Sequence, residues 1–187
     1  MNIFHLSVKQ KFMSVQVKSK KQTQAKKRPI DLYFEQYAEH HQHPTNKLIH
    51  WIYVPLITFG ISGLIWFIPF PHLDFLGRYN GFINWFTIAM ALVVYYYLRL
   101  APTLSYAMLF SFGIFSYLIV QLEYWEKAGG PAPWLVCLII FIVAWIGRFI
   151  GHRMEGEKAP FSVEIKFLLI GPIWLWHFIF KKLGIPY

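Results

Sequence analysis

Four of the chain's eight histidines lie within residues 40–50, directly before the first long apolar run. A fifth, His152, follows the last such run and stands three residues before Glu155. On a continuing helix, residues three apart point to the same side, so both would face one site. Imidazole and carboxylate groups build open Fe(II) sites, and zinc accepts the same ligands. The sequence therefore predicts a metal site between the two ends of the apolar region.

Proline positions show which of the clustered histidines can reach that site. Pro44 disfavours a helical residue before it and suits the first turn of a new helix, which leaves His41 at a corner. Asn46 and His50 then lie four apart on one face of the new helix. We expect His41, His50 and His152 to bind the metal, and Glu155 is a further candidate ligand. The alternative is that each histidine only caps a helix or contacts lipid headgroups, and that Glu155 pairs with a nearby basic residue.

The composition predicts an all-α, polytopic membrane protein. Apolar residues make up 56% of the 187 residues and charged residues only 14%. Residues 51–70, 82–98, 104–122 and 132–147 contain no charged residue. Each stretch is near the roughly 20 residues that cross a bilayer as a helix, and helices satisfy their own backbone groups there. We therefore expect a bundle of four transmembrane helices, in which Pro55, Gly60 and Gly63 mark a bend or a close helix contact.

Two shorter segments flank the predicted spans. After Pro29, apolar residues at helical spacing predict a short amphipathic helix with Asp31 as its N-cap. Near the end of the chain, the apolar residues 167–180 are interrupted by Gly171 and Pro172. This stretch is too short to span comfortably, so it predicts a re-entrant or interfacial segment.

Basic residues predict the orientation and the domain organisation. Residues 1–30 hold eight basic and no acidic residues, and six more basic residues occupy the C-terminal part. The positive-inside rule then places both termini in the cytoplasm, at the endoplasmic reticulum of a eukaryote or the inner membrane of a bacterium. We expect residues 1–28 to be a disordered basic tail and residues 29–187 to form a single membrane-embedded helical domain. Nucleic-acid binding is disfavoured because the charge lies on a tail rather than on a folded surface.

Three ordered sequence blocks resemble an integral-membrane family that includes the 2-hydroxy fatty acid dioxygenase of phytosphingosine degradation. Residues 37–55 read Y-x3-H-x4-N-x3-H-x4-P, residues 149–158 read F-I-G-H-x2-E-G-x-K, and residues 167–174 read F-L-L-I-G-P-x-W. The resemblance covers about residues 31–184 and leaves the basic tail outside. This chain departs from many members around residues 155–157, where others place an aromatic residue and then a glutamate one position later.

The resemblance implies Fe(II)-dependent α-oxidation, in which a 2-hydroxy fatty acid and O2 give a fatty acid one carbon shorter and CO2. His41, His50 and His152 match the family's histidines and would bind the iron, while Asn46 would position a ligand or the substrate carboxylate. Arg148 or Arg153 would neutralise that carboxylate, because a guanidinium group suits its geometry. The departure near Glu155 leaves the role of that residue and the substrate of this branch open.

Two other functions compete with this prediction. In the first, the chain is a non-catalytic membrane protein that binds lipid or scaffolds partners, and the histidines only organise the interface. In the second, it is a diiron lipid hydroxylase or desaturase, but those enzymes use more histidine pairs at short spacing. The sequence predicts no particular oligomeric state or substrate chain length.

Overall fold

The computed structural model describes residues 27–154 and 161–187, with the backbone alone at residues 78, 79, 82 and 161–165. All regular structure within these residues is helical, as predicted. The predicted disordered tail lies outside the described residues except for Lys27 and Arg28, and so does Glu155. The elements are α2 (Pro29–Glu39), α3 (Pro44–Trp66), the 3-10 segment η1 (Asp74–Phe82), α4 (Trp85–Leu100), α5 (Pro102–Lys127), α6 (Pro133–Met154) and α7 (Phe161–Leu183).

Prolines set where several helices begin. Four helices begin at a proline, whose missing N–H is unneeded there: Pro29, Pro44, Pro102 and Pro133. The predicted helix start at Pro44 is therefore confirmed. The predicted N-cap at Asp31 is wrong, because Pro29 starts α2 earlier and Arg28 takes the cap position. Asp31 instead lies in the first turn, where its carboxylate accepts two 2.9 Å hydrogen bonds from Arg28.

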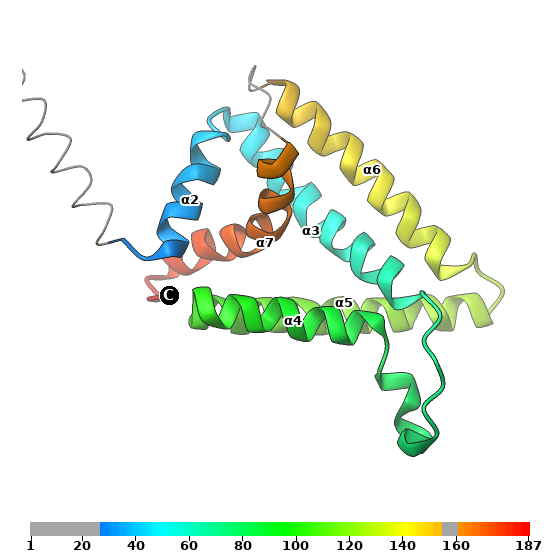
Figure 1. Ribbon diagram of the computed structural model, residues 1–187. Coiled ribbons are helices and arrows are strands. Elements are labelled where there is room, and N and C mark those ends of the chain that lie inside the picture. Colours follow the sequence, from blue (N-terminus) through cyan, green and yellow to red (C-terminus); the bar gives the residue numbers. More distant parts are fainter. Residues whose placement is uncertain (1–26, 155–160) are drawn as a thin grey trace, which may run out of the picture.

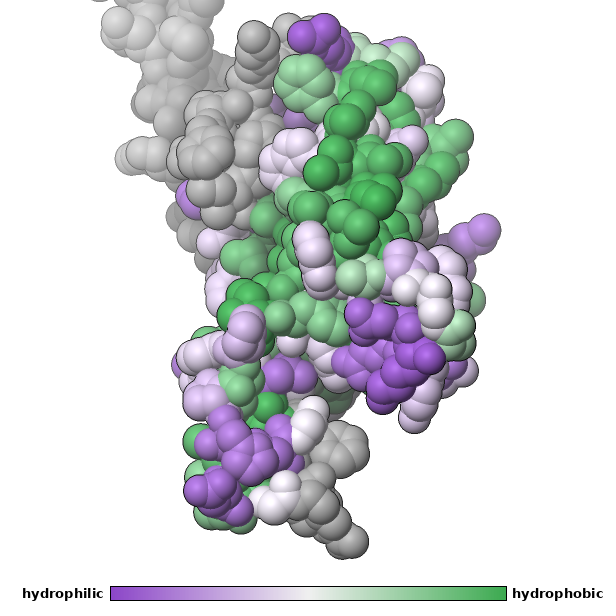
Figure 2. All heavy atoms as spheres, turned by 90° about the vertical axis from the view of Figure 1, so that its right-hand side faces the viewer, coloured by the Kyte–Doolittle hydropathy of each residue, from purple (hydrophilic) through white to green (hydrophobic). Residues whose placement is uncertain are grey.

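Three helices are long and apolar enough to cross a membrane: α3, α5 and α6. They contain or overlap the predicted spans at 51–70, 104–122 and 132–147. The outer surface of α6 carries exposed apolar side chains, among them Ile139, Val143 and Ile146. Figure 2, which shows this side of the molecule, has a continuous apolar area. With 16 residues, α4 is shorter than a typical span, so a crossing by residues 82–98 stays a prediction.

Small residues let α3 and α6 pack closely along their length. The two helices run in opposite directions side by side (Figure 1). A Cβ added to Gly63 would lie 2.2 Å from Cys137 Sγ, and one added to Gly147 would lie 2.4 Å from the ring of Tyr53. Close helix contact through glycine is a recurring way of packing membrane helices, which confirms the contact predicted at Gly60 and Gly63. The antiparallel packing brings the start of α3 to the end of α6.

Helix α7 fills the space at this end of the bundle, where it contacts α2, α3 and α5. It is one helix of 23 residues with Pro172 inside it. Figure 1 shows the helix changing direction near its middle, as expected where a proline removes a backbone hydrogen bond. The predicted interruption at Gly171 and Pro172 is thus a bend within a helix. Whether the segment is re-entrant or interfacial stays a prediction.

Candidate metal centre

His41, His50 and His152 come together from three separate elements. His41 follows α2, His50 lies in the second turn of α3, and His152 lies in the last turn of α6. One ring nitrogen of each lies within 4.8 Å of those of the other two. His41 and His50 have no exposed surface, and His152 is half-buried. The grouping matches the prediction from sequence, and its assignment as a metal site remains a proposal.

The backbone of α2 fixes the orientation of the His41 ring. The Nδ1 atom of His41 lies 2.6 Å from the carbonyl oxygen of Tyr37. A carbonyl only accepts, so Nδ1 carries the proton and the lone pair is on Nε2, the nitrogen suited to a metal. The Tyr37 ring also stacks on the His41 ring, with centroids 4.2 Å apart and planes 8° from parallel. Such contacts hold a ligand in place before the metal binds.

The rings of the three histidines form a triangle, in which those of His41 and His152 are 5.5 Å apart and His50 is the third corner. The ring centroid of His50 is 4.1 Å from that of His41 and 5.3 Å from that of His152. Both of its ring nitrogens are buried, and neither has a hydrogen-bond partner among the described residues. A buried polar group left without a partner costs about 1–3 kcal/mol, which a metal–nitrogen bond would remove. A metal ion therefore fits the chemistry of this position.

Asn46 links the two helices beside the histidines. It lies one turn before His50 on α3 and is fully buried. A Cβ added to Gly151 would lie 2.3 Å from Asn46 Oδ1, so Asn46 packs against the bare backbone just before His152. The predicted pair on one face of the helix, Asn46 and His50, is therefore present, and glycine at position 151 provides the room for the amide.

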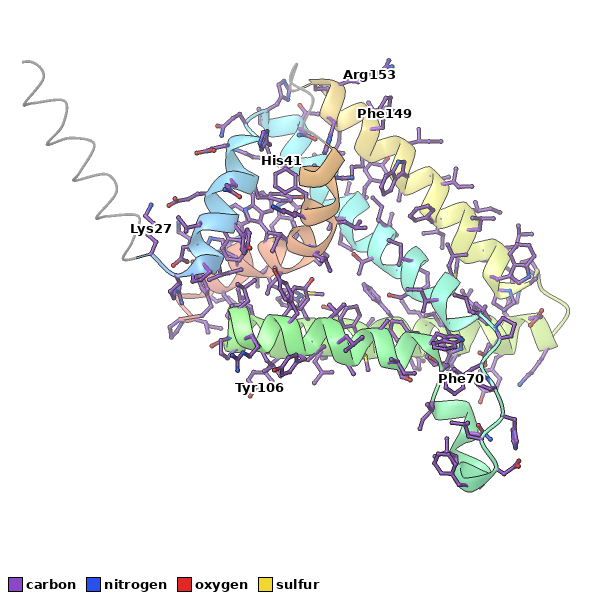
Figure 3. The ribbon with its side chains drawn as sticks, viewed as in Figure 1. Lys27, His41, Phe70, Tyr106, Phe149 and Arg153 are labelled. Atoms are coloured by element: carbon purple, nitrogen blue, oxygen red, sulfur yellow. The ribbon has the colours of Figure 1, made fainter. Side chains whose placement is uncertain are left out.

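The two candidate arginines lie in different surroundings. Arg148, one turn before His152 on α6, is 6% exposed, and its guanidinium group lies 5.5 Å from the centre of the Trp145 ring. Arg153 is exposed, and its guanidinium group stacks over Phe149 at 4.8 Å. Figure 3 shows Arg153 and Phe149 on the outer side of α6, away from His41. The structure thus groups Arg148, but not Arg153, with the histidines.

Three aromatic residues form a wall around the site that the sequence analysis did not assign: Tyr37, Phe167 and Trp174. Their rings lie 4.2, 5.7 and 6.2 Å from the His41 ring, respectively. All three are buried. Tyr37 stands one turn before His41, and Phe167 and Trp174 are two turns apart on α7. This helical spacing was the available signal.

Other histidines in the described part of the chain have different surroundings. His43 is the N-cap of α3, where its Nδ1 accepts a 3.2 Å hydrogen bond from the Thr45 amide. His40 lies against Phe167, and exposed His72 lies on the loop after α3, beside Asp74. Among the described residues, the candidate ligands are therefore three imidazoles. Three neutral imidazoles leave coordination positions open, and both iron and zinc accept them.

A family model described as "2-hydroxy-palmitic acid dioxygenase Mpo1-like" matches residues 28–183. The match covers most of the chain, which therefore belongs to the Mpo1-like family, as the three sequence blocks predicted. No curated protein and no solved structure was found to match the chain.

Proposed function

We propose that this member of the Mpo1-like family is an Fe(II)-dependent dioxygenase that shortens a 2-hydroxy fatty acid by one carbon. The observation that carries the proposal is the buried group of His41, His50 and His152 on three separate elements. The family description names a dioxygenase of a 2-hydroxy acid, and this group offers a place for the metal that such a reaction needs. The acid and O2 would give the shorter fatty acid, CO2 and water, which balances every atom.

Bound iron would supply the redox chemistry with O2, which no amino-acid side chain provides. The protein's own residues would hold and shield the reacting groups. His41 is oriented by the Tyr37 carbonyl, and the aromatic wall of Tyr37, Phe167 and Trp174 keeps bulk water from one side of the site. Asn46 belongs to α3 and packs against Gly151 of α6, so it would fix the spacing between His50 and His152.

Arg148 is the residue that we assign to the substrate carboxylate. A buried guanidinium group forms charge-assisted and often bidentate hydrogen bonds with a carboxylate, and its planar geometry holds the acid in one orientation. Arg148 lies one turn before His152 on α6, so it would place the carboxylate and the neighbouring hydroxyl near the histidines. Arg153 stacks on Phe149 on the outer surface, so it is the weaker candidate.

We also propose that this site lies at the cytoplasmic face and that both termini are cytoplasmic. The support is the concentration of basic residues in the N-terminal tail and the C-terminal part, together with three helices that can span a membrane. The carboxyl end of a substrate drawn from the bilayer would then reach the histidines.

The test is the metal content and activity of the full-length protein, purified without oxygen in mild detergent. Wild type should bind about one iron per chain, and His50→Ala and His152→Ala should lose it. His72→Ala is the matched control, because His72 is exposed and lies on a loop outside the histidine group. Folding of each variant is verified by circular dichroism and size-exclusion chromatography.

Activity is then measured with 2-hydroxypalmitic acid and O2, by the release of CO2 and by mass spectrometry of the shortened acid. Product from wild type and His72→Ala, but not from the two site variants, supports the proposal. Absence of stoichiometric iron after anaerobic Fe(II) loading refutes it. The non-catalytic lipid-binding alternative would then become the better interpretation.

A further inference from the structure

Two neighbouring, partly open apolar pockets, called the first and second lobe, lie between the helices of the bundle. The first lobe, of about 230 Å³, lies between α3, α5 and α7. The second lobe, of about 130 Å³, lies between α3, α4, α5 and α7. Thr58, Met108 and Pro172 line both lobes, so they form the wall between them.

The first lobe is apolar because the polar side chains that line it are already hydrogen bonded. The Thr58 hydroxyl donates to the Val54 carbonyl at 2.9 Å. The Ser111 hydroxyl donates to the Ala107 carbonyl at 3.0 Å and accepts from the Trp176 indole N–H at 2.9 Å. A buried water needs two to four polar partners, so a space lined in this way suits an apolar occupant better than water.

Along the axes of α3 and α7, the first lobe begins at the level of the histidine site, although none of the three histidines lines it. Trp51, which lines it, directly follows His50 on α3, and Thr58 lies eight residues beyond His50. At about 1.5 Å per residue, the lobe therefore extends to roughly 12 Å along the helix from His50. On α7, Trp174 packs near His41, and the next residue, Leu175, lines the lobe.

The first lobe is also accessible from the side of the protein that would face lipid. Trp51 is 40% exposed and Ile114 is 43% exposed, and both line the lobe. They belong to α3 and α5, two of the three helices that can span a membrane. An acyl chain could therefore move from the bilayer into the lobe without exposing its methylene groups to water, a step that the hydrophobic effect would oppose.

We propose that the first lobe holds the acyl chain of the substrate and that Met108 limits the length of the chain that fits. This inference rests on the proposed function, which places the 2-hydroxy acid group beside Arg148 and the histidines. The lobe then receives the apolar remainder of the same molecule. Met108 is 1% exposed and lies in the wall between the lobes, so trimming it joins them into one longer space.

The first experiment locates the chain without requiring turnover. Full-length protein in lipid nanodiscs is irradiated with a 2-hydroxypalmitic acid analogue that carries a diazirine near its methyl end, and the labelled peptides are mapped by mass spectrometry. We expect labels on α3, α5 and α7 at the first lobe, suppressed by excess 2-hydroxypalmitic acid. Ile114→Trp, which fills the lobe, should lower this labelling about tenfold or more, because even one methylene that no longer fits is worth roughly 10- to 200-fold.

The matched control is Ile139→Trp, the same change at an exposed position on the lipid-facing side of α6. It should leave the labelling at the first lobe unchanged. Labels spread over the outer surface of α6, or labelling that Ile114→Trp does not reduce, would overturn the proposal. Because the label reports binding alone, labelling of the lobe without any product would instead count against the proposed function and not against the cavity.

The second experiment tests the role of Met108 with 2-hydroxy acids of increasing chain length. Wild type and Met108→Ala are compared by labelling competition and, where product forms, by kcat/KM. Met108→Ala should shift the preference towards longer chains by about tenfold or more, relative to wild type. An unchanged preference in a variant with normal iron content would refute the role of Met108.

Discussion

Replacing Gly151 with alanine should damage the metal site more than the fold. The added Cβ would lie 2.3 Å from Asn46 Oδ1 and 2.9 Å from Ile49 Cγ2, so one of these groups must move. Overpacking of this kind costs about 1–3 kcal/mol, while alanine in a helix is favoured over glycine by about 1 kcal/mol. The free energy of unfolding should therefore fall by only about 0–2 kcal/mol.

The affinity for iron should fall further. Asn46 packs between the helices that carry His50 and His152, and loss of a partner that positions metal ligands typically lowers metal affinity by about 10- to 100-fold. The affinity is measured without oxygen by competition with a chromophoric Fe(II) chelator. The melting temperature is measured on the same samples by scanning fluorimetry.

Two other glycines provide controls. Gly63→Ala overpacks the same helix pair, because its Cβ would lie 2.2 Å from Cys137 Sγ, but Gly63 is about 20 Å along α3 from His50. Gly113→Ala meets no atom within 4 Å and should leave both the melting temperature and the iron affinity near wild type. Normal iron affinity in Gly151→Ala, or an equal loss of iron in Gly63→Ala, would refute the reasoning.

Three further predictions follow from single contacts. Arg148→Gln should raise KM for 2-hydroxypalmitic acid by about 10- to 100-fold, which corresponds to the loss of one charge-assisted hydrogen bond. The iron content should stay normal. A loss of iron as large as the loss of substrate affinity would contradict the assignment of Arg148 to the substrate. Tyr37→Leu removes the ring stacked on His41 and should lower the affinity for iron about tenfold. Tyr37→Phe keeps the ring and should have the iron affinity of wild type in the same chelator competition. Burial lowers the pKa of His177 below its usual 6.5. As the pH falls below about 6.5, the unfolded chain therefore takes up a proton before the folded protein does, and the folded protein loses stability. Melting curves at several pH values should show a weaker loss of stability for His177→Phe than for wild type.

Local sequence patterns predicted the parts of the site that depend on one helix. The helix start at Pro44 and the pairing of Asn46 with His50 on one face follow from proline geometry and helical spacing, and both are present. The position of the Asp31 cap was wrong because Pro29 competes for the start of the same helix. The closeness of the α3–α6 contact depends on which residue of the other helix faces each glycine, and a single sequence does not contain that pairing.

The aromatic wall was missed for a different reason. In a membrane protein, tyrosine and tryptophan near the ends of apolar stretches are expected at the lipid headgroups, so Trp174 had an adequate explanation without the site. Its place beside His41 arises from the bend of α7 at Pro172 and from the packing of α7 on α2, which are long-range contacts. Helical spacing related only Tyr37 to a candidate ligand, because it stands one turn before His41. The two-turn spacing of Phe167 and Trp174 places them on one face of α7 but does not relate that face to His41.

Helical periodicity in the sequence would have distinguished the two candidate arginines. Arg148 precedes His152 by four residues, so the two side chains lie on the same face of α6, and the structure buries Arg148. Arg153 is adjacent to His152 in sequence and therefore points to a different side, where it stacks on Phe149. Sequence proximity to a candidate ligand is thus the weaker criterion on a helix. The residue one turn away is the better candidate for a shared substrate, and Arg148→Gln beside Arg153→Gln tests that difference directly, since only the first should change KM.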